Sequence, residues 1–304
     1  MTESSPRADD RCGTRLHLVD GTYELFRAHF SKRPSRTDRQ GRDVKATVGL
    51  VSSLLGLLED AGEAPTHLAV AFDNPIESWR NERFGPYKSS EGVDPDLLAQ
   101  FDRAERAVAA LGVRLWSMDE YEADDALATA AVRFAPEVGQ VRILTPDKDL
   151  AQVVRDTHIV QVDRLRQTVR DEAGVWEKFG VGPASIADLL ALVGDAADGI
   201  PGLAGFGAKS AATLLARYVH LDAIPDDADD WDVTVRGAAR LAATLRDQRA
   251  EAELYRELTV LATDLDLGAD LEDLAWSGVP RESYLAWCDE LGVTALRDRP
   301  TRWT

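Results

Sequence analysis

Three short segments decide the fold of this chain: LHLVD at residues 16–20, LAVAFD at 68–73 and VRILTPDKD at 141–149. Each is an apolar run of strand length that leads into aspartate. Helix-like patterns lie between them, and this alternation is typical of an α/β fold with a mainly parallel sheet flanked by helices. Ligands of such sheets bind beyond the carboxyl ends of the strands, so we expect the acids to face one crevice.

The expected crevice collects seven carboxylates, because YEADDAL at 121–127 opens a helix between the last two segments. The seven are Asp20, Asp73, Glu122, Asp124, Asp125, Asp147 and Asp149. Crowded like charges repel, and Mg²⁺ or Mn²⁺, which prefer oxygen ligands, would relieve the repulsion. Two such ions can clamp a phosphodiester, which points to metal-dependent chemistry on phosphate. The alternative is that each acid only caps a helix or a turn.

The helix at 121–127 presents its acids on two sides. Glu122 and Asp125 are three residues apart and share a helix face. Asp124 points elsewhere, which predicts either a second ligand set or an N-terminal capping role.

The composition indicates a globular, acidic protein. The chain has 304 residues, of which 44% are hydrophobic, and a net charge of −18. No apolar run approaches the ~20 residues of a membrane span, and the polar start does not resemble a signal peptide. We expect a cytoplasmic protein with a disordered tail at 1–14. Cys12 and Cys288 predict neither a disulfide nor a cysteine metal site.

The net charge alone argues against a nucleic-acid partner, because phosphate binding relies on Lys and Arg. The stretch 27–45 differs, with seven basic residues and two acidic ones. We interpret it either as a solvated loop or as a surface for phosphate.

The remaining patterns predict helices at 45–60 and 94–111 and strands at 113–116 and 158–162. From about Gly182 the patterns are helical, at 183–193, 208–218 and 236–263. We therefore expect a catalytic domain at 15–181 and a helical region at 182–304.

A glycine-rich connector, GDAADGIPGLAGFG at 194–207, joins two of these helices. Such a turn lets backbone N–H groups approach phosphate at a helix N-terminus, where Lys209 adds charge. Helix–turn–helix units can grip a DNA backbone in this way. Asp195 and Asp198 could reach the metal crevice. The alternative is a loop that merely closes two packed helices.

A third candidate region, SWRNERFGPYK at 78–88, mixes basic and aromatic residues after the second strand. Arg80, Arg83 and Lys88 could engage phosphate, and Tyr87 could stack on a base.

Together these motifs resemble the 5′-nuclease family, which includes the 5′→3′ exonuclease domain of bacterial DNA polymerase I, phage 5′-exonucleases and flap endonucleases. The matching strings are LVDG at 18–21, FD at 72–73, YK at 87–88, YEADD at 121–125, ILTPDKDL at 143–150 and the connector through Ala211. The resemblance covers roughly residues 15 to 290. It implies a PIN-like core and a helix-three-turn-helix DNA-binding module at about 183–218.

The resemblance also implies roles, position by position. One metal would be surrounded by Asp20, Asp73, Glu122 and Asp124, shared partly with Asp125. The second would be held by Asp147, Asp149 and Asp198, supported by Asp195. The basic residues that match those handling phosphates near the cut are Arg27, Arg80 and Lys88. The duplex backbone would contact Gly199, Gly202, Gly205 and Gly207, often with a monovalent cation such as K⁺.

The implied activity is hydrolysis of DNA phosphodiesters at 5′ ends, flaps or nicks, with two divalent ions. By default we expect a monomer, in the cytoplasm and associated with the nucleoid. The chain stops at Thr304, so we expect a stand-alone nuclease without a polymerase. It departs from the family at Glu91, where many relatives carry a basic residue that helps to thread single strands. Two alternatives remain: a structure-specific DNA-binding protein with weak or no cleavage, and a phosphatase of small esters. DNA binding should weaken steeply with salt, whereas ester hydrolysis should not.

Overall fold

A computed structural model describes residues 13–304, and these residues form two compact units. Unit 1 comprises residues 13–78, 90–145 and 263–304, and unit 2 comprises 79–89 and 146–262. Most of the tail expected at 1–14, including Cys12, lies outside the described residues. Cys288 is buried. Within 13–304, no helix has the length and apolar character needed to cross a membrane.

Unit 1 contains the parallel strands predicted from the three opening segments and the strand predicted at 113–116. They are β1 (Arg15–Asp20), β2 (His67–Asp73), β3 (Arg114–Met118) and β4 (Gln140–Leu144). In the order β3-β2-β1-β4 each strand runs parallel to its neighbour. Leu18 pairs with both Ala69 and Ile143, and all three are fully buried. Sheets that are buried on both faces need continuous apolar strands, which is the pattern seen here.

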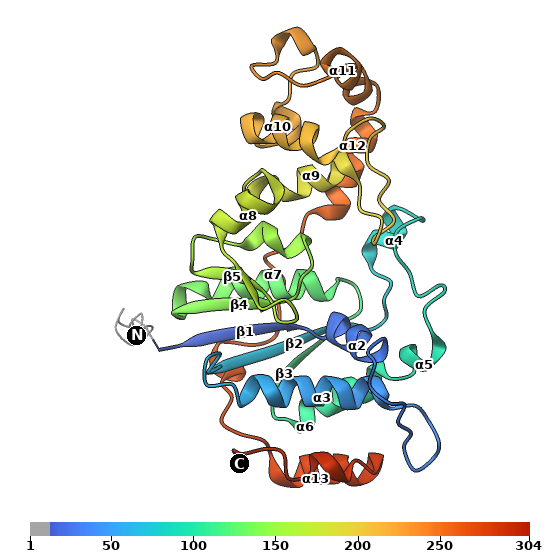
Figure 1. The fold of residues 1–304 in the computed structure, drawn as a ribbon, viewed down its shortest axis with the longest axis vertical. Helices are drawn as coiled ribbons and strands as arrows, with labels where there is room; N and C mark the ends of the chain where they lie inside the picture. Colours follow the sequence, from blue (N-terminus) through green and yellow to red (C-terminus); the bar gives the residue numbers. More distant parts are fainter. Residues whose placement is uncertain (1–12) are drawn as a thin grey trace. The chain divides into compact units, whose positions relative to one another are not determined.

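Helices cover both faces of these strands, with α7 on one side and α3 and α6 on the other (Figure 1). The helices of unit 1 are α2 (Gly21–His29), α3 (Lys45–Leu58), α5 (Pro95–Leu98), α6 (Phe101–Ala110), α7 (Ala123–Phe134) and α13 (Arg281–Leu291). The helix predicted at 94–111 is therefore two helices. The buried Gln100 precedes α6. Its side-chain Nε2 donates to Asp43 Oδ1 at 2.9 Å, and its Oε1 accepts from the amide N of Thr47 at 3.1 Å. These hydrogen bonds to residues outside the helices stabilise the interruption between α5 and α6.

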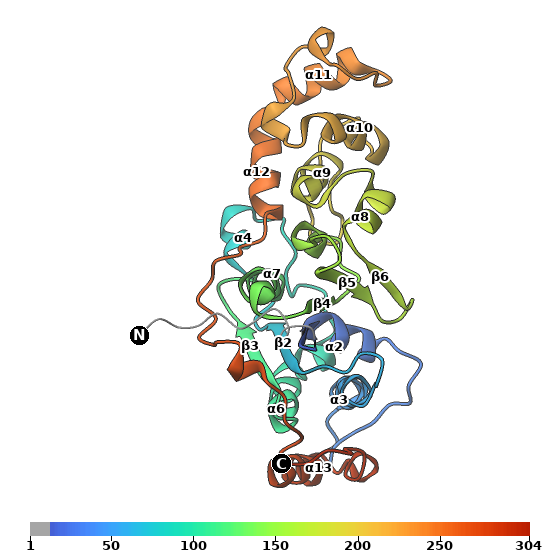
Figure 2. The ribbon, with the colours of Figure 1, turned by 90° about the vertical axis from the view of Figure 1, so that its left-hand side faces the viewer.

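Unit 2 combines a hairpin with a helical core (Figure 2). The hairpin pairs β5 (Ile159–Asp163) with β6 (Thr168–Arg170) in antiparallel fashion. The helices are α4 (Trp79–Arg83), α8 (Glu172–Phe179), α9 (Ile186–Val193), α10 (Ala208–Tyr218), α11 (Ala238–Asp247) and α12 (Arg249–Thr259). A 3₁₀ turn, η2 (Asp149–Val153), carries one of the predicted metal ligands.

The single helix predicted at 236–263 is two helices in the structure, α11 and α12. Leu245 of α11 and Ala252 of α12 both pack into one apolar cluster with Leu190 and Leu214. The backbone leaves the helical conformation at Gln248, which lies between the two helices. Arg249, the first residue of α12, donates to the carbonyls of Leu221 at 2.9 Å and Ile224 at 3.2 Å, so hydrogen bonds to residues outside both helices accompany the break.

Candidate metal and nucleic-acid site

The first group of predicted ligands lies in unit 1, where parallel strands end. Asp20 is the last residue of β1 and Asp73 the last of β2, and both strands end at one edge of the sheet because they are parallel. Asp20 is 7% exposed and Asp73 is 8% exposed. The sheet therefore presents both carboxylates where the sequence predicts a crevice.

Hydrogen bonds orient these two carboxylates. Asp20 Oδ1 accepts from the amide N of Tyr23 at 2.8 Å, which caps α2, and its Oδ2 accepts from Thr145 Oγ1 at 2.9 Å. Asp73 Oδ1 accepts from the amide N of Ala123 at 2.7 Å. The capping role that we weighed as an alternative is thus real for Asp20. It also pre-orients the carboxylate, as the outer contacts of metal ligands do.

The start of α7 holds the other acids of unit 1. Ser78 Oγ donates to Glu122 Oε1 at 2.8 Å, and the amide N of Glu122 donates to Asp125 Oδ2 at 3.0 Å. Glu122 and Asp125 form the capping box of the helix, and Asp125 is fully buried. Capping therefore falls to these two residues. Asp124, for which a capping role was one of two options, lies half-buried in the first turn.

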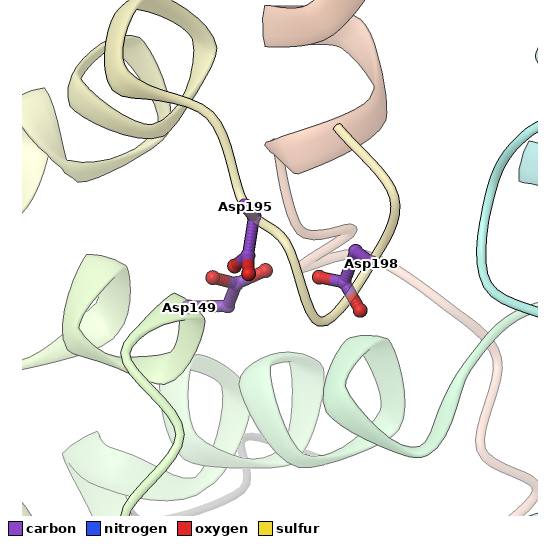
Figure 3. Close-up of side chains that lie close together, drawn as sticks. All are labelled: Asp149, Asp195 and Asp198. Atoms are coloured by element: carbon purple, nitrogen blue, oxygen red, sulfur yellow. The ribbon is translucent and has the colours of Figure 1, made fainter. Parts of the chain in front are cut away.

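The second group lies in unit 2 and is the more crowded. Oxygens of Asp149, Asp195 and Asp198 all lie within 4.8 Å of one another (Figure 3). Among residues 13–304, this is the one set of three or more acidic, histidine or cysteine side chains gathered so closely. Asp149 and Asp195 are buried, and Asp198 is half-buried.

Asp149 carries a carboxylate oxygen of this group that has no hydrogen-bond donor. Its Oδ1 is buried and has no hydrogen-bond partner among the described residues. Burial raises the pKa of Asp149 well above its usual range, and the charges of Asp147, Asp198 and Asp195 raise it further. A buried carboxylate oxygen without a donor is costly. An oxygen-only ligand set with an orphaned atom fits a hard divalent cation.

Two lysines partly neutralise the group. Lys148 Nζ lies 2.7 Å from Asp195 Oδ2, and Lys88 Nζ lies 3.4 Å from Asp198 Oδ1. Burial would lower the pKa of Lys148, but the hydrogen bond to Asp195 and the nearby aspartate charges raise it overall. We did not assign Lys148 a role from the sequence. Its place between two predicted ligands, Asp147 and Asp149, was the available signal.

Asp147 stands slightly apart, as an exposed residue before η2. Its Oδ1 accepts from the amide N of Asp149 at 3.1 Å, and its carbonyl accepts from Gln161 Nε2.

The connector 194–207 brings Asp195 and Asp198 to Asp149 by a tight turn. The backbones of Asp195 and Ile200 exchange two hydrogen bonds of 2.8 Å. Gly199 adopts φ +75°, and a Cβ there would lie 2.3 Å from the carbonyl oxygen of Pro86. Gly202 adopts φ +69°, and a Cβ there would lie 2.4 Å from the amide N of Gly194. Both glycines are therefore required to close the turn.

The other residues in and after the connector that we predicted to contact DNA, Gly205, Gly207 and Lys209, differ in their surroundings. Gly205 adopts φ +89° beside the guanidinium of Arg240. Gly207 precedes α10, has open space where a Cβ would stand, and accepts from Ser210 Oγ at 3.0 Å. Lys209 is exposed in the first turn of α10.

Two predictions for region 78–88 need correction. Arg80 is 1% exposed, its Nε donates to the carbonyl of Leu258 at 2.7 Å, and its Nη2 donates to that of Val260 at 3.2 Å. It satisfies carbonyls at the end of α12 instead of facing a phosphate. Tyr87 is 4% exposed and packs on Ile200 and Leu258, so its ring is a core contact and not a surface for a base.

Other basic residues that we predicted to engage phosphate also have partners within the protein. Arg27 pairs with the buried Glu24 and donates to Ser53 Oγ at 3.1 Å. Arg83 forms a bidentate salt bridge with Glu257. Its Nε lies 3.0 Å from Oε1, and its Nη2 lies 3.0 Å from Oε2. Of the basic stretch, Lys45 Nζ caps the carbonyls of His29 and Ser31. Three other cations, Arg33, Arg36 and Arg299, share with Lys45 the lining of a pocket of about 580 Å³.

Comparison with solved structures defines the fold class. The chain is similar to T5 5′-exonuclease with bound zinc, with a TM-score of 0.65 and 17% identity, covering 92% of this chain and 99% of that one. It is also similar to the catalytic core of Rad2 in complex with DNA substrate, with a TM-score of 0.60 and 15% identity, covering 97% and 90%. The chain therefore shares the fold of these two proteins.

Sequence comparison identifies the family itself. The N-terminal resolvase-like domain of 5′-3′ exonuclease matches residues 15–180, and the C-terminal SAM fold of 5′-3′ exonuclease matches 181–282. The chain belongs to the 5′-3′ exonuclease family, which confirms the resemblance seen in the motifs.

The curated relatives are longer proteins. DNA polymerase I of Pseudomonas aeruginosa is 37% identical over 285 residues, which cover 91% of this chain and 30% of that protein. DNA polymerase I of Mycobacterium tuberculosis H37Rv is 34% identical over 304 residues, covering 98% and 33%. The chain thus spans about a third of the length of these relatives.

Proposed function

We propose that this protein is a metal-dependent 5′→3′ exonuclease that also cleaves 5′ flaps, acting on phosphodiesters of DNA. The observation that carries the proposal is the group of Asp149, Asp195 and Asp198 with its orphaned carboxylate oxygen, in a chain of the 5′-3′ exonuclease family. Such a group needs a cation, and the family supplies a reaction that uses one.

Each unit offers its own ligand set for one divalent ion, Mg²⁺ or Mn²⁺. In unit 1 the set is Asp20, Asp73, Glu122 and Asp124, with Asp125 behind them. In unit 2 it is Asp147, Asp149 and Asp198, with Asp195 in support. When bound, such ions polarise the phosphoryl group and lower the pKa of water.

The residues of the chain contribute positioning and charge. Thr145, Ser78 and the amide of Ala123 hold the carboxylates of unit 1 in orientation. Lys88 is a quarter exposed beside Asp198, so its ammonium can move from that carboxylate to a phosphate oxygen of the substrate. Arg80 has no catalytic part in this proposal and Tyr87 does not stack on a base, because both side chains are buried in unit 2.

DNA would be held by the connector and the start of α10. Gly205, Gly207 and Lys209 leave this turn open to a phosphate, and a K⁺ ion could join the backbone carbonyls to the DNA. Arg83 would add a surface charge after release from Glu257. The protein would act as a monomer at the nucleoid, in replication or repair, on DNA with 5′ ends, flaps or nicks.

The test is product sizing on end-labelled flap, nicked and single-stranded DNA with Mg²⁺, Mn²⁺ or EDTA. We expect metal-dependent release of short products from 5′ ends and cleavage near the base of 5′ flaps. Tight binding of flap DNA without cleavage in either metal would instead favour a structure-specific DNA-binding protein. Hydrolysis of small phosphate esters alone, with little salt dependence, would favour a phosphatase.

A further inference from the structure

Residues 258–261, at the end of α12 and just beyond it, form a largely buried segment of unit 2 that we call the α12 terminus. The last carbonyls of a helix have no partner within the helix itself. Here side chains from other segments supply the donors. Arg80 donates to two carbonyls of the α12 terminus, and Gln152 Nε2 donates to the carbonyl of Thr259 between them at 2.8 Å.

Gln152 uses both ends of its side-chain amide on this segment. Besides the bond to Thr259, its Oε1 accepts from the amide N of Leu261 at 3.3 Å. Gln152 lies in η2, three residues after the proposed metal ligand Asp149. A 3₁₀ helix has three residues per turn, so these two side chains share a face of η2. Gln152 therefore fixes η2 on the face that carries Asp149.

The α12 terminus also contacts α9, which ends at Val193, directly before the connector 194–207. The buried Thr259 donates from its Oγ1 to the carbonyl of Ala187 in α9 at 3.0 Å, and the carbonyl of Arg256 at 3.1 Å is its alternative acceptor. The bond to Ala187 fixes α9 against α12, and thereby the point from which the connector starts.

Apolar packing joins the α12 terminus to the connector itself. Leu258, Ile200 and Tyr87 form one small buried cluster. Ile200 is the residue whose backbone pairs with that of Asp195 in the tight turn. The α12 terminus thus contacts both segments that carry the acids of the group, η2 and the connector.

These contacts matter because the acidic group opposes its own assembly. Crowded carboxylates repel one another, which favours separation of η2 from the connector. Lys148 offsets part of the repulsion through its pair with Asp195. The bonds and packing to α12 oppose the remainder, since they attach both segments to one helix. Mg²⁺ demands a near-ideal octahedral arrangement of ligands, whereas Ca²⁺ accepts a flexible one. Displacement of Asp149 should therefore weaken the binding of Mg²⁺ more than that of Ca²⁺.

We propose that Gln152 is a positioning residue for Asp149, and that the α12 terminus sets the separation between Asp149 and the acids of the connector. The inference rests on the proposed function and deepens it, because it assigns the fit of Mg²⁺ to contacts outside the ligand set. Gln152 acts through η2 and not on the substrate. A side-chain amide suits this role because it donates to one backbone group while it accepts from another, which an ionised carboxylate cannot do.

The test compares Gln152→Met with Arg249→Met. Methionine keeps an unbranched side chain but restores neither hydrogen bond of Gln152. Arg249 is the matched control because it also donates to two carbonyls, at the opposite end of α12. At 1.5 Å per residue, that end lies about 15 Å from Thr259. Thermal melting is recorded in EDTA and over titrations of Mg²⁺ and of Ca²⁺. Asp149→Asn defines the part of the response that belongs to the group in unit 2.

Both methionine variants should melt at a lower temperature than the wild type in EDTA, because each leaves carbonyls without a donor. Gln152→Met should also need about tenfold more Mg²⁺ for half of its rise in Tm, while its Ca²⁺ midpoint should change by less than about threefold. Arg249→Met should keep both midpoints. Cleavage of 5′-flap DNA by Gln152→Met should fall at low Mg²⁺ and recover at tenfold higher Mg²⁺, with KM for the DNA unchanged.

A second pair of variants serves if Gln152→Met does not fold. Thr259→Val removes the hydroxyl that bonds to Ala187 and keeps the shape of the side chain, whereas Thr259→Ser keeps the hydroxyl. The valine variant should raise the Mg²⁺ midpoint several-fold, and the serine variant should match the wild type.

The outcomes separate the inference from the proposed function. If the wild type responds to Mg²⁺ and cleaves flap DNA, while Gln152→Met and Thr259→Val keep its Mg²⁺ midpoint, the inference is wrong and the proposed function stands. An equal shift of the midpoint in Arg249→Met would also overturn the inference, because loss of stability alone would then explain it. If the wild type neither gains stability from Mg²⁺ nor cleaves DNA, both are wrong.

Discussion

Lys148 Nζ lies 2.7 Å from Asp195 Oδ2, so an ammonium group contacts the carboxylate that supports the proposed metal ligands of unit 2. Asp195 is 3% exposed, whereas Lys148 is one-third exposed. The lysine thus supplies positive charge from the solvent side to a carboxylate that burial would otherwise leave unpaired.

Substitution of Lys148 by Met should destabilise the metal-free protein and increase its response to metal. Removing one partner of a fully buried ion pair lowers the free energy of unfolding by about 3–5 kcal/mol. Because Lys148 is partly exposed, we expect a loss of about 1–3 kcal/mol here. Thermal melting in EDTA and in Mn²⁺ measures both effects. The rise in Tm with Mn²⁺ should be larger in Lys148→Met than in Lys148→Arg, because the metal no longer competes with an ammonium group. A smaller rise would show that Lys148 assists metal binding.

Asp149→Asn should separate stability from activity. The change removes one of the crowded charges and gives the orphaned position an amide, so the free energy of unfolding in EDTA should rise by about 1–3 kcal/mol. Cleavage with Mg²⁺ should fall by about 100-fold or more, while DNA binding remains measurable. Urea denaturation and initial cleavage rates provide the two readouts. Near-normal cleavage would contradict the assignment of Asp149 as a metal ligand.

Arg80→Ala should destabilise unit 2, because the carbonyls of Leu258 and Val260 lose a charged donor inside the core. We expect a loss of about 2–4 kcal/mol. Arg83→Ala is the matched control, since it removes an exposed pair with Glu257 and should cost less than about 1 kcal/mol. Denaturant titration of both variants measures the difference. Equal losses would show that Arg80 does not hold α12.

Unit 1 should lose stability on acidification through His17, Glu63 and Arg142. The hydrogen bond from His17 lowers the pKa of Glu63 from 4.5 to about 2, with Arg142 also contributing. Because the folded pKa is depressed, this stabilisation is complete above about 4.5 and is lost as the pH falls towards 2. Burial also lowers the pKa of His17, so protonation of the histidine below about 6.5 favours the unfolded chain.

Urea denaturation at several pH values between 7.5 and 2.5 checks this prediction. Glu63→Gln should be less stable than the wild type at neutral pH and should lose less stability between pH 4.5 and 2. Parallel stability curves for the two proteins would exclude Glu63 as a source of the pH dependence.

Much of the fold could be predicted from the chain because it depends on local patterns. Apolar runs of strand length, separated by helix-like stretches, predicted β1, β2, β3, β4 and β5 and most helices of both units. The breaks at Gln100 and Gln248 could not be predicted, because each is held by packing or hydrogen bonds to distant residues. Strand β6 and helices α2, α4 and α8 were not predicted, and each is a short element.

The sequence by itself determined the family and the chemical character of the site, since the acids, glycines and lysines recur at informative spacings along the chain. The tertiary structure alone decided which of these residues meet and which are buried. It brought Asp195 and Asp198 to Asp149, placed Lys148 against Asp195, and enclosed Arg80 and Tyr87 in the core. The physical reason is that side-chain type fixes what a residue can do, whereas burial and convergence depend on contacts between segments far apart in the chain.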